Sequence, residues 1–246
     1  MITVSNKQVD KLNNLIIENH ISEMIRFVEK YYPNHSKLLG DNINNYVTQV
    51  INKAFEYKLT SEKNIYLLLN MSLLLGAHFD ENPLYEWCST FQLKNTPDQD
   101  LENIATITLK KIHQITGNDH QKIYRLIVLF QKEKDSIFLK LKKSENIISF
   151  IKQLQEIYPS KFEIVDLEKI KILHNNSKKI GKKYLILKEE NLYILSFLQF
   201  CIGYDFDRDI LFHFMNKIFL SKMDEDSKCE LLYNDSIVTL EKFLNR

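Results

Sequence analysis

Apolar residues recur along most of this chain at the three- and four-residue spacing of an amphipathic helix. The spacing predicts helices over these segments: 20–31, 41–58, 61–75 and 98–115, then 146–157, 166–183, 188–202 and 225–244. A further helix should begin at Asn82 and Pro83, because asparagine is a good N-cap and proline suits the first helical position. The apolar segment 122–141 is interrupted by charged residues. It is compatible with one helix, two helices, or a helix followed by an extended piece.

Two of these helices should be buried at the centre of the fold. Segments 61–75 and 188–202 are apolar around almost their whole circumference. Each is followed by glycine, which ends a helix by adopting a positive φ without strain. A phenylalanine and an aspartate come next, and we expect them to fill the core and to start the following helix. We therefore assign a structural role to a repeated motif: Gly76, Phe79 and Asp80, then Gly203, Phe206 and Asp207.

The chain repeats itself. Residues 57–80 align with residues 184–207 without a gap, and eight positions are identical. The identical pairs begin with Tyr57 and Tyr184 and end with Asp80 and Asp207. Segment 20–33 also aligns with segment 146–159, and both end in Tyr-Pro. The sequence therefore predicts an all-α fold of two tandem homologous helical-bundle units, packed with pseudo-twofold symmetry. Their bounds are 1–116 and 122–246, with a short join at 117–121.

The second predicted helix differs between the two copies. Segment 41–58 carries an apolar stripe, whereas its counterpart is far more polar. Val47, Val50 and Ile51 are replaced by His174, Ser177 and Lys178. This asymmetry suggests that the polar helix faces solvent or a partner, although a basic run of this kind is more often a solvated helix end. The candidate partner-binding residues are His174, Ser177, Lys178, Lys179, Lys182 and Lys183.

Composition narrows the functional classes. The 246 residues include only 5 glycines and 4 prolines, which favours long helices over the many tight turns of an all-β fold. The formal net charge is +1, so the chain lacks the basic excess that is typical of nucleic-acid binders. We therefore expect no nucleic-acid partner.

Cysteine usage and hydropathy indicate a cytoplasmic protein. The three cysteines are widely spaced, which favours neither a disulfide framework nor a C-x-x-C metal site. The N-terminal residues resemble no signal peptide. The most apolar run, 65–75, is too short to span a bilayer. We expect no contact with a membrane.

Catalytic motifs are missing from the sequence. The seven histidines have neither HExxH spacing nor cysteine neighbours at zinc spacing. Nucleophile elbows, phosphate loops and EF-hand loops are also missing. We expect no catalytic residue, no cofactor and no metal ion. Carboxylates that only folding brings together leave no mark in a sequence, so a toxin enzyme within the helical scaffold stays the alternative.

A set of spaced residues resembles a known family. The pattern is carried by Tyr32-Pro33, Ala54, Tyr57, Leu59, Glu62, Leu75-Gly76, Phe79-Asp80, Pro83 and Trp87. The second copy keeps Tyr158-Pro159, Tyr184, Glu189, Gly203, Phe206 and Asp207, and departs at Gly181, Ile210 and Phe214. The pattern is similar to that of small helical proteins of unknown function. Their genes lie beside type VI secretion effectors and spike components in Gram-negative bacteria.

The resemblance covers residues 20–115 well and 146–244 more weakly. It implies a protein partner: a secreted effector, a toxin or a spike component. Two stoichiometric roles suit that setting. One is an adaptor or chaperone that delivers an effector to the spike, and the other is an immunity protein that blocks a toxin. The resemblance does not choose between them.

Overall fold

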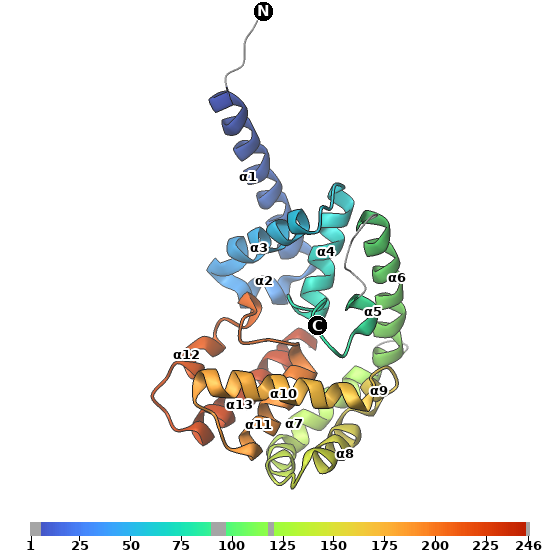
Figure 1. The fold of residues 1–246 in the computed structure, drawn as a ribbon, viewed down its shortest axis with the longest axis vertical. Coiled ribbons are helices and arrows are strands. Elements are labelled where there is room, and N and C mark those ends of the chain that lie inside the picture. The colour runs from blue at the N-terminus through green and yellow to red at the C-terminus, as the bar shows by residue number, and fades with distance from the viewer. Residues whose placement is uncertain (1–5, 90–96, 118–120, 245–246) are drawn as a thin grey trace, which may run out of the picture.

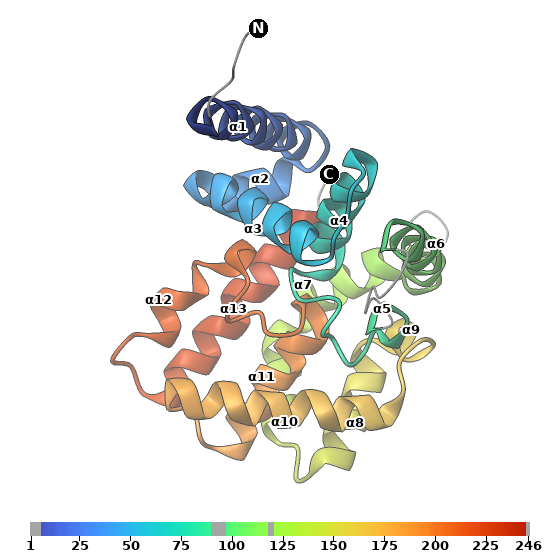
Figure 2. The same cartoon turned by 45° about the horizontal axis from the view of Figure 1, so that its top comes forward.

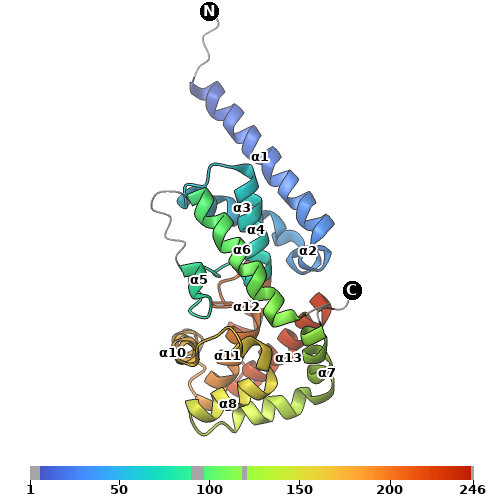
Figure 3. The same cartoon turned by 90° about the vertical axis from the view of Figure 1, so that its right-hand side faces the viewer.

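The computed structural model describes residues 6–89, 97–117 and 121–244. Within these residues the chain forms helices and no strands, which confirms the all-α fold class. We call residues 6–117 the first half and residues 121–244 the second half. Figure 3 shows the first half above the second, with the first helix extending away from the rest. Among the described residues, no helix is both long enough and apolar enough to cross a bilayer.

The first half begins with a helix that is longer than predicted. Its elements are α1 (Asn6–Tyr31), α2 (Pro33–Leu39), η1 (Gly40–Asn42), α3 (Ile43–Glu56), α4 (Glu62–Leu75), α5 (Glu86–Ser89) and α6 (Pro97–Thr116). The break between α1 and α2 falls at Tyr32, which has φ −130° and ψ 54°. The following proline disfavours helical geometry at this residue.

The second half is also built from helices throughout its described length. Its elements are α7 (Gln121–Lys142), α8 (Ile147–Ile157), α9 (Pro159–Phe162), α10 (Leu167–Tyr184), α11 (Glu189–Ile202), η3 (Ile210–Phe212), α12 (Met215–Phe219) and α13 (Glu225–Leu244). The segment that the sequence left undecided is a helix with a kink at Glu133, where φ is −122° and ψ is 15°. The predicted join at 117–121 lies partly outside the described residues.

The helix predicted to start at Asn82 and Pro83 is not there. Turns occupy most of the connection from α4 to the short α5. The side chain of Asn82 accepts a hydrogen bond from the backbone N–H of Leu84 at 3.0 Å, and so closes a turn instead of capping a helix. In the second half Asp209, not Asp207, caps the next element by accepting from Leu211 at 2.9 Å.

Asp80 and Asp207 tie neighbouring segments together instead of starting helices. Asp80 accepts hydrogen bonds from Lys53 and from the hydroxyl of Tyr57. Asp207 accepts from Lys183 at 2.9 Å and from the hydroxyl of Tyr184 at 3.2 Å. Asp80 therefore ties the turn after α4 to the C-terminal end of α3. Asp207 likewise ties the turn after α11 to the C-terminal end of α10. Phe79 and Phe206, one residue earlier, are both fully buried.

The helices α4 and α11 lie at the centre of their halves. In α11 nearly every side chain is buried, and α10, α7 and α13 pack around it (Figure 2). In α4 the packing partners are α3 and α6. The buried side chains of both halves form one continuous hydrophobic cluster. The halves therefore share a core, and burial of this apolar surface is the main force that holds them together.

The contact between the halves, which we call the seam, is reciprocal. Helix α2 of the first half packs on α13 and η3 of the second, and α9 of the second half packs on α6 of the first. At the middle of the seam Gly76 and Gly203 approach each other. A Cβ atom added to Gly76 would lie 3.7 Å from the Cα of Gly203. Both glycines have positive φ, 95° and 138°, a conformation that other residues adopt only with strain.

Candidate functional site

The polar face of α10 packs against α11 instead of facing solvent. His174 and Ser177 are both buried, so our expectation that they are exposed is wrong. His174 stacks on Tyr193, with ring centroids 4.9 Å apart. Ser177 accepts a hydrogen bond from Gln199 at 2.6 Å. The polar residues of α10 thus meet polar residues of α11, and buried polar groups that find partners carry little cost.

One part of this interface has the composition of a catalytic triad. His174 Nε2 lies 3.0 Å from Glu189, and its Nδ1 lies 2.8 Å from the hydroxyl of Ser196. Burial lowers the pKa of His174, which favours the neutral ring. However, Ser196 is fully buried on the inner face of α11. A substrate carbonyl could reach this hydroxyl only if α10 separated from α11. We therefore interpret His174, Glu189 and Ser196 as a structural network.

Of the candidate lysines of α10, one contacts that network and three do not. Lys178 pairs with Glu189 at 3.3 Å, and Lys183 pairs with Asp207 at 2.9 Å. Lys179 and Lys182 are exposed. The lysines at the C-terminal end of α10 therefore surround the loop that leads to α11 with positive charge. Such charges also suit the negative end of the helix dipole.

Exposed apolar side chains project from the two loops at this end of the second half. Leu185 and Leu187, between α10 and α11, are 73% and 62% exposed. Leu220 and Met223, between α12 and α13, are 76% and 38% exposed. We call these four residues the loop-tip patch. Lysines flank them in the sequence: Lys182, Lys183, Lys188 and Lys222.

Two contacts place the two loops side by side. The ring of Tyr184, just before Leu185, stacks on that of Phe219, just before Leu220, with centroids 4.2 Å apart. The backbone N–H of Leu187 donates to the carboxylate of Glu225 at 2.6 Å. In Figures 1 and 2 both loops lie on the left-hand side of the second half. The patch is therefore one surface formed by two loops.

The fold does not require leucine at these positions. In the alignment Leu185 corresponds to Lys58, and Leu187 corresponds to Thr60. Leu185 and Lys58 even share the same unusual backbone, with φ values of 60° and 56°. The first half therefore builds the same loop with polar residues. The second half instead exposes two leucines. Packing within the chain does not explain their exposure, and exposed apolar side chains of this kind are found on interaction surfaces.

A cavity of about 350 Å³ lies in the seam. Both halves contribute to its lining, which includes Leu75, Ile115, Phe130, Tyr158 and Lys161. Most of the lining side chains are aliphatic or aromatic, and we call this space the seam cavity. Lys161 was not among the residues predicted from the sequence. Its position could have indicated it, because Lys161 lies two residues after Tyr158-Pro159 just as His35 lies two residues after Tyr32-Pro33.

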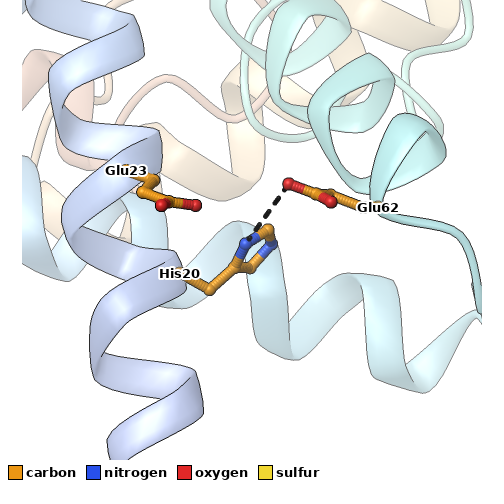
Figure 4. A group of neighbouring side chains, drawn as sticks. All are labelled: His20, Glu23 and Glu62. Atoms are coloured by element: carbon orange, nitrogen blue, oxygen red, sulfur yellow. Dashed lines mark ion pairs between the residues drawn. The ribbon is translucent and has the colours of Figure 1, made fainter.

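A group with metal-ligand chemistry lies on the surface of the first half. His20 and Glu23 on α1 and Glu62 on α4 bring one ligand atom each to within 4.8 Å of the others (Figure 4). His20 Nδ1 lies 4.0 Å from a carboxylate oxygen of Glu62. Both glutamates are exposed. Exposed acidic groups of this kind are common without a bound ion, so the cluster supports no assignment by itself.

No protein-family model matches the chain, and comparison with curated proteins and with solved structures finds no match either. Evidence for function therefore comes from the chain's own residues and surfaces.

Proposed function

We propose that this chain is a non-enzymatic binding protein whose protein partner docks on the loop-tip patch. The exposure of Leu185 and Leu187 carries the proposal. Isolated apolar side chains are ordinary on protein surfaces, but here four gather on two adjacent loops beside charged residues, lysines as well as Asp224 and Glu225. An apolar centre with a charged rim is the usual anatomy of a protein–protein interface.

The rim indicates the charge of the partner. Lys182 and Lys183 lie just before the α10–α11 loop, and Lys188 lies at its end. Lys188 pairs with Asp226 at 2.5 Å. Of the two α10 lysines, Lys183 is engaged with Asp207, whereas Lys182 is exposed. An acidic partner surface would complement this rim, accelerate association and make its rate depend on salt.

The scaffold beneath the patch is, in this proposal, a tandem duplication with pseudo-twofold symmetry. Helices α4 and α11 each span 14 residues, and their first and last residues correspond in the sequence alignment. The two aligned asparagines also each bond to an aspartate in the first turn of the last helix of their half. Asn64 bonds to Asp98 at 2.9 Å and Asn191 to Asp226 at 3.0 Å. The reciprocal contacts of α2 and α9 across the seam are those that an isologous pair would make.

Duplication leaves one copy free to change its surface while the other keeps the fold. The first half retains the apolar stripe of α3, whereas the second half has rebuilt the same interface with polar pairs between α10 and α11. The exposed leucines are likewise confined to the second half's version of the loop. We therefore place the partner on the second half.

The class of partner comes from the family resemblance. We propose a secreted effector, a toxin or a spike component of a type VI secretion module as the partner, and the cytoplasm as the compartment. Either an adaptor or an immunity protein would bind its partner in a defined stoichiometric complex. Neither role requires a catalytic centre.

The products of the genes that flank this one provide the test. One of them should co-purify with the chain, and replacing Leu185 with Lys and Leu187 with Thr should abolish co-purification. An immunity protein will restore growth when it is co-expressed with the toxin. An adaptor will leave toxicity intact and will be needed for secretion. Growth inhibition by this chain alone, or no binding by any neighbour, would contradict the proposal.

A further inference from the structure

The seam cavity holds a buried ammonium group that has no counter-ion among the described residues. Lys161 is only 5% exposed. Among the described residues, no carboxylate lies within 4.0 Å of its Nζ atom. Glu241 also lines the cavity. A buried charge that is not paired is costly, so its presence in a cavity wall requires an explanation.

The chain compensates this charge only in part. Lys161 donates one hydrogen bond to the backbone carbonyl of Phe200. Three aromatic rings lie around the ammonium, with Nζ 4.7 Å from the ring centroid of Phe200, 5.7 Å from that of Tyr85 and 5.9 Å from that of Tyr158. Aromatic faces attract a cation, but they accept no strong hydrogen bond. An ammonium has three N–H donors, so two have no acceptor among the described residues and can serve a ligand.

The corresponding residue of the first half shows that a charge is not needed here for folding. His35 occupies the position of Lys161 and lies 3.1 Å from the carbonyl of Leu73, the counterpart of Phe200. Both side chains line the same cavity. Histidine thus satisfies the matching carbonyl with a group that can be neutral. The second half carries a lysine at the equivalent point.

The remaining lining defines the rest of a ligand. Aliphatic and aromatic side chains from α4, α6, α7 and α11 form most of the cavity wall. The volume, about 350 Å³, falls at the lower end of the range for small-molecule sites. A molecule that fits would have an apolar body and one anionic group.

We propose that the seam cavity binds a small amphipathic monocarboxylate, with its carboxylate on Lys161 and its apolar body against Ile115, Leu126 and Phe130. A charge-assisted hydrogen bond from the ammonium would orient the ligand, and the apolar walls would supply most of the affinity. This site is separate from the loop-tip patch and does not depend on the proposed protein partner.

Titration of the full chain with decanoate and with decanol tests the proposal. The two probes share an apolar tail and differ in charge. By calorimetry, decanoate should bind once per chain and decanol at least tenfold more weakly. Replacing Lys161 with Met should weaken decanoate binding at least tenfold and leave decanol unchanged. Replacing the exposed Lys182 with Met is the matched control and should change neither affinity.

Replacing Ile115 with Trp should fill the cavity and abolish binding of both probes. The Lys161→Met chain should also melt no lower than the unmodified chain, because it removes a buried unpaired charge. If it does not fold, the two probes on the unmodified chain and the Ile115→Trp variant still decide. No binding of decanoate, equal binding of decanol, or decanoate binding that survives Lys161→Met or Ile115→Trp would overturn the proposal.

Discussion

The carboxylate of Asp209 accepts a hydrogen bond from the backbone N–H of Ala77 at 2.9 Å, and this bond joins the two halves of the chain. The other carboxylate oxygen accepts from Leu211, also at 2.9 Å. Burial raises the pKa of Asp209, and the two backbone donors oppose that effect. At the aligned position the first half has Asn82, whose side chain makes the local bond to Leu84. The second half therefore supplies a buried side chain that links the halves.

Replacing Asp209 with Ala should lower the free energy of unfolding by about 2–4 kcal/mol, because it leaves two backbone donors without their acceptor. Asp209→Asn should lose less, since an amide oxygen can still accept from Leu211. Asp235→Ala, at an exposed position on α13, is the control. Urea unfolding measures all three. Equal stability of the alanine variant and the control would contradict the role given to Asp209.

Gly181 is a glycine because its neighbours leave no room for a side chain. A Cβ atom there would lie 2.3 Å from the carbonyl oxygen of Ile186 and 2.6 Å from Leu192. Gly181→Ala should therefore cost about 1–3 kcal/mol in spite of alanine's higher helix propensity. The aligned residue of the first half is Ala54, where the opposite change, Ala54→Gly, should cost about 1 kcal/mol. Thermal unfolding of both variants checks the contrast; a stabilised Gly181→Ala would refute it.

His35 should make the fold sensitive to acid. Burial lowers its pKa from 6.5 to about 4. Below pH 6.5 the unfolded chain binds a proton that the folded chain does not, so stability falls as the pH drops from 6.5 to 4. The loss from this residue should be roughly 2–3 kcal/mol. His35→Gln should flatten the stability curve in this window, and His113→Gln, at an exposed position, should not. A curve that His35→Gln leaves unchanged would contradict the assignment.

The basic rim should govern how fast the partner associates. Replacing Lys182 and Lys222 with Glu should lower the association rate constant at low salt, with a smaller effect at high salt, because ions screen the attraction. Glu substitutions at Lys132 and Lys152, which are exposed on α7 and α8, control for the change in net charge. Stopped-flow kinetics at two salt concentrations measures the effect. A rate that changes equally in both variants would show that the rim does not steer the partner.

Local patterns in the sequence predicted the helices well where a strong periodicity coincided with end signals. The helix α4 starts after Ser61, whose hydroxyl accepts from the N–H of Asn64 at 3.2 Å, and it ends at a glycine. The kink in α7 at Glu133 and the turn at Asn82 were not predicted, because tertiary packing and turn chemistry decide them. The N-terminal extension of α1 to Asn6 was missed, although Val9, Leu12 and Ile16 recur there at helical spacing.

The candidate site was harder to predict because the burial and contacts of its residues depend on the helices packed against them. The sequence of α10 by itself predicts that His174 is exposed. Its burial is explained by the polar groups of α11 that it contacts. Lys161 becomes unusual only once the opposite half closes a cavity around it. Leu185 was visible in the alignment as a replacement of Lys58, and this comparison of aligned surface positions is the signal that could have found the patch.

Titration calorimetry with the purified partner measures whether the partner docks on the loop-tip patch. The double variant Leu185→Lys, Leu187→Thr carries the residues of the first half and should fold normally. Its control is Ile148→Lys on α8, where the isoleucine is 62% exposed. We predict at least tenfold weaker binding for the double variant and unchanged binding for the control. Unchanged affinity of the double variant would contradict the account.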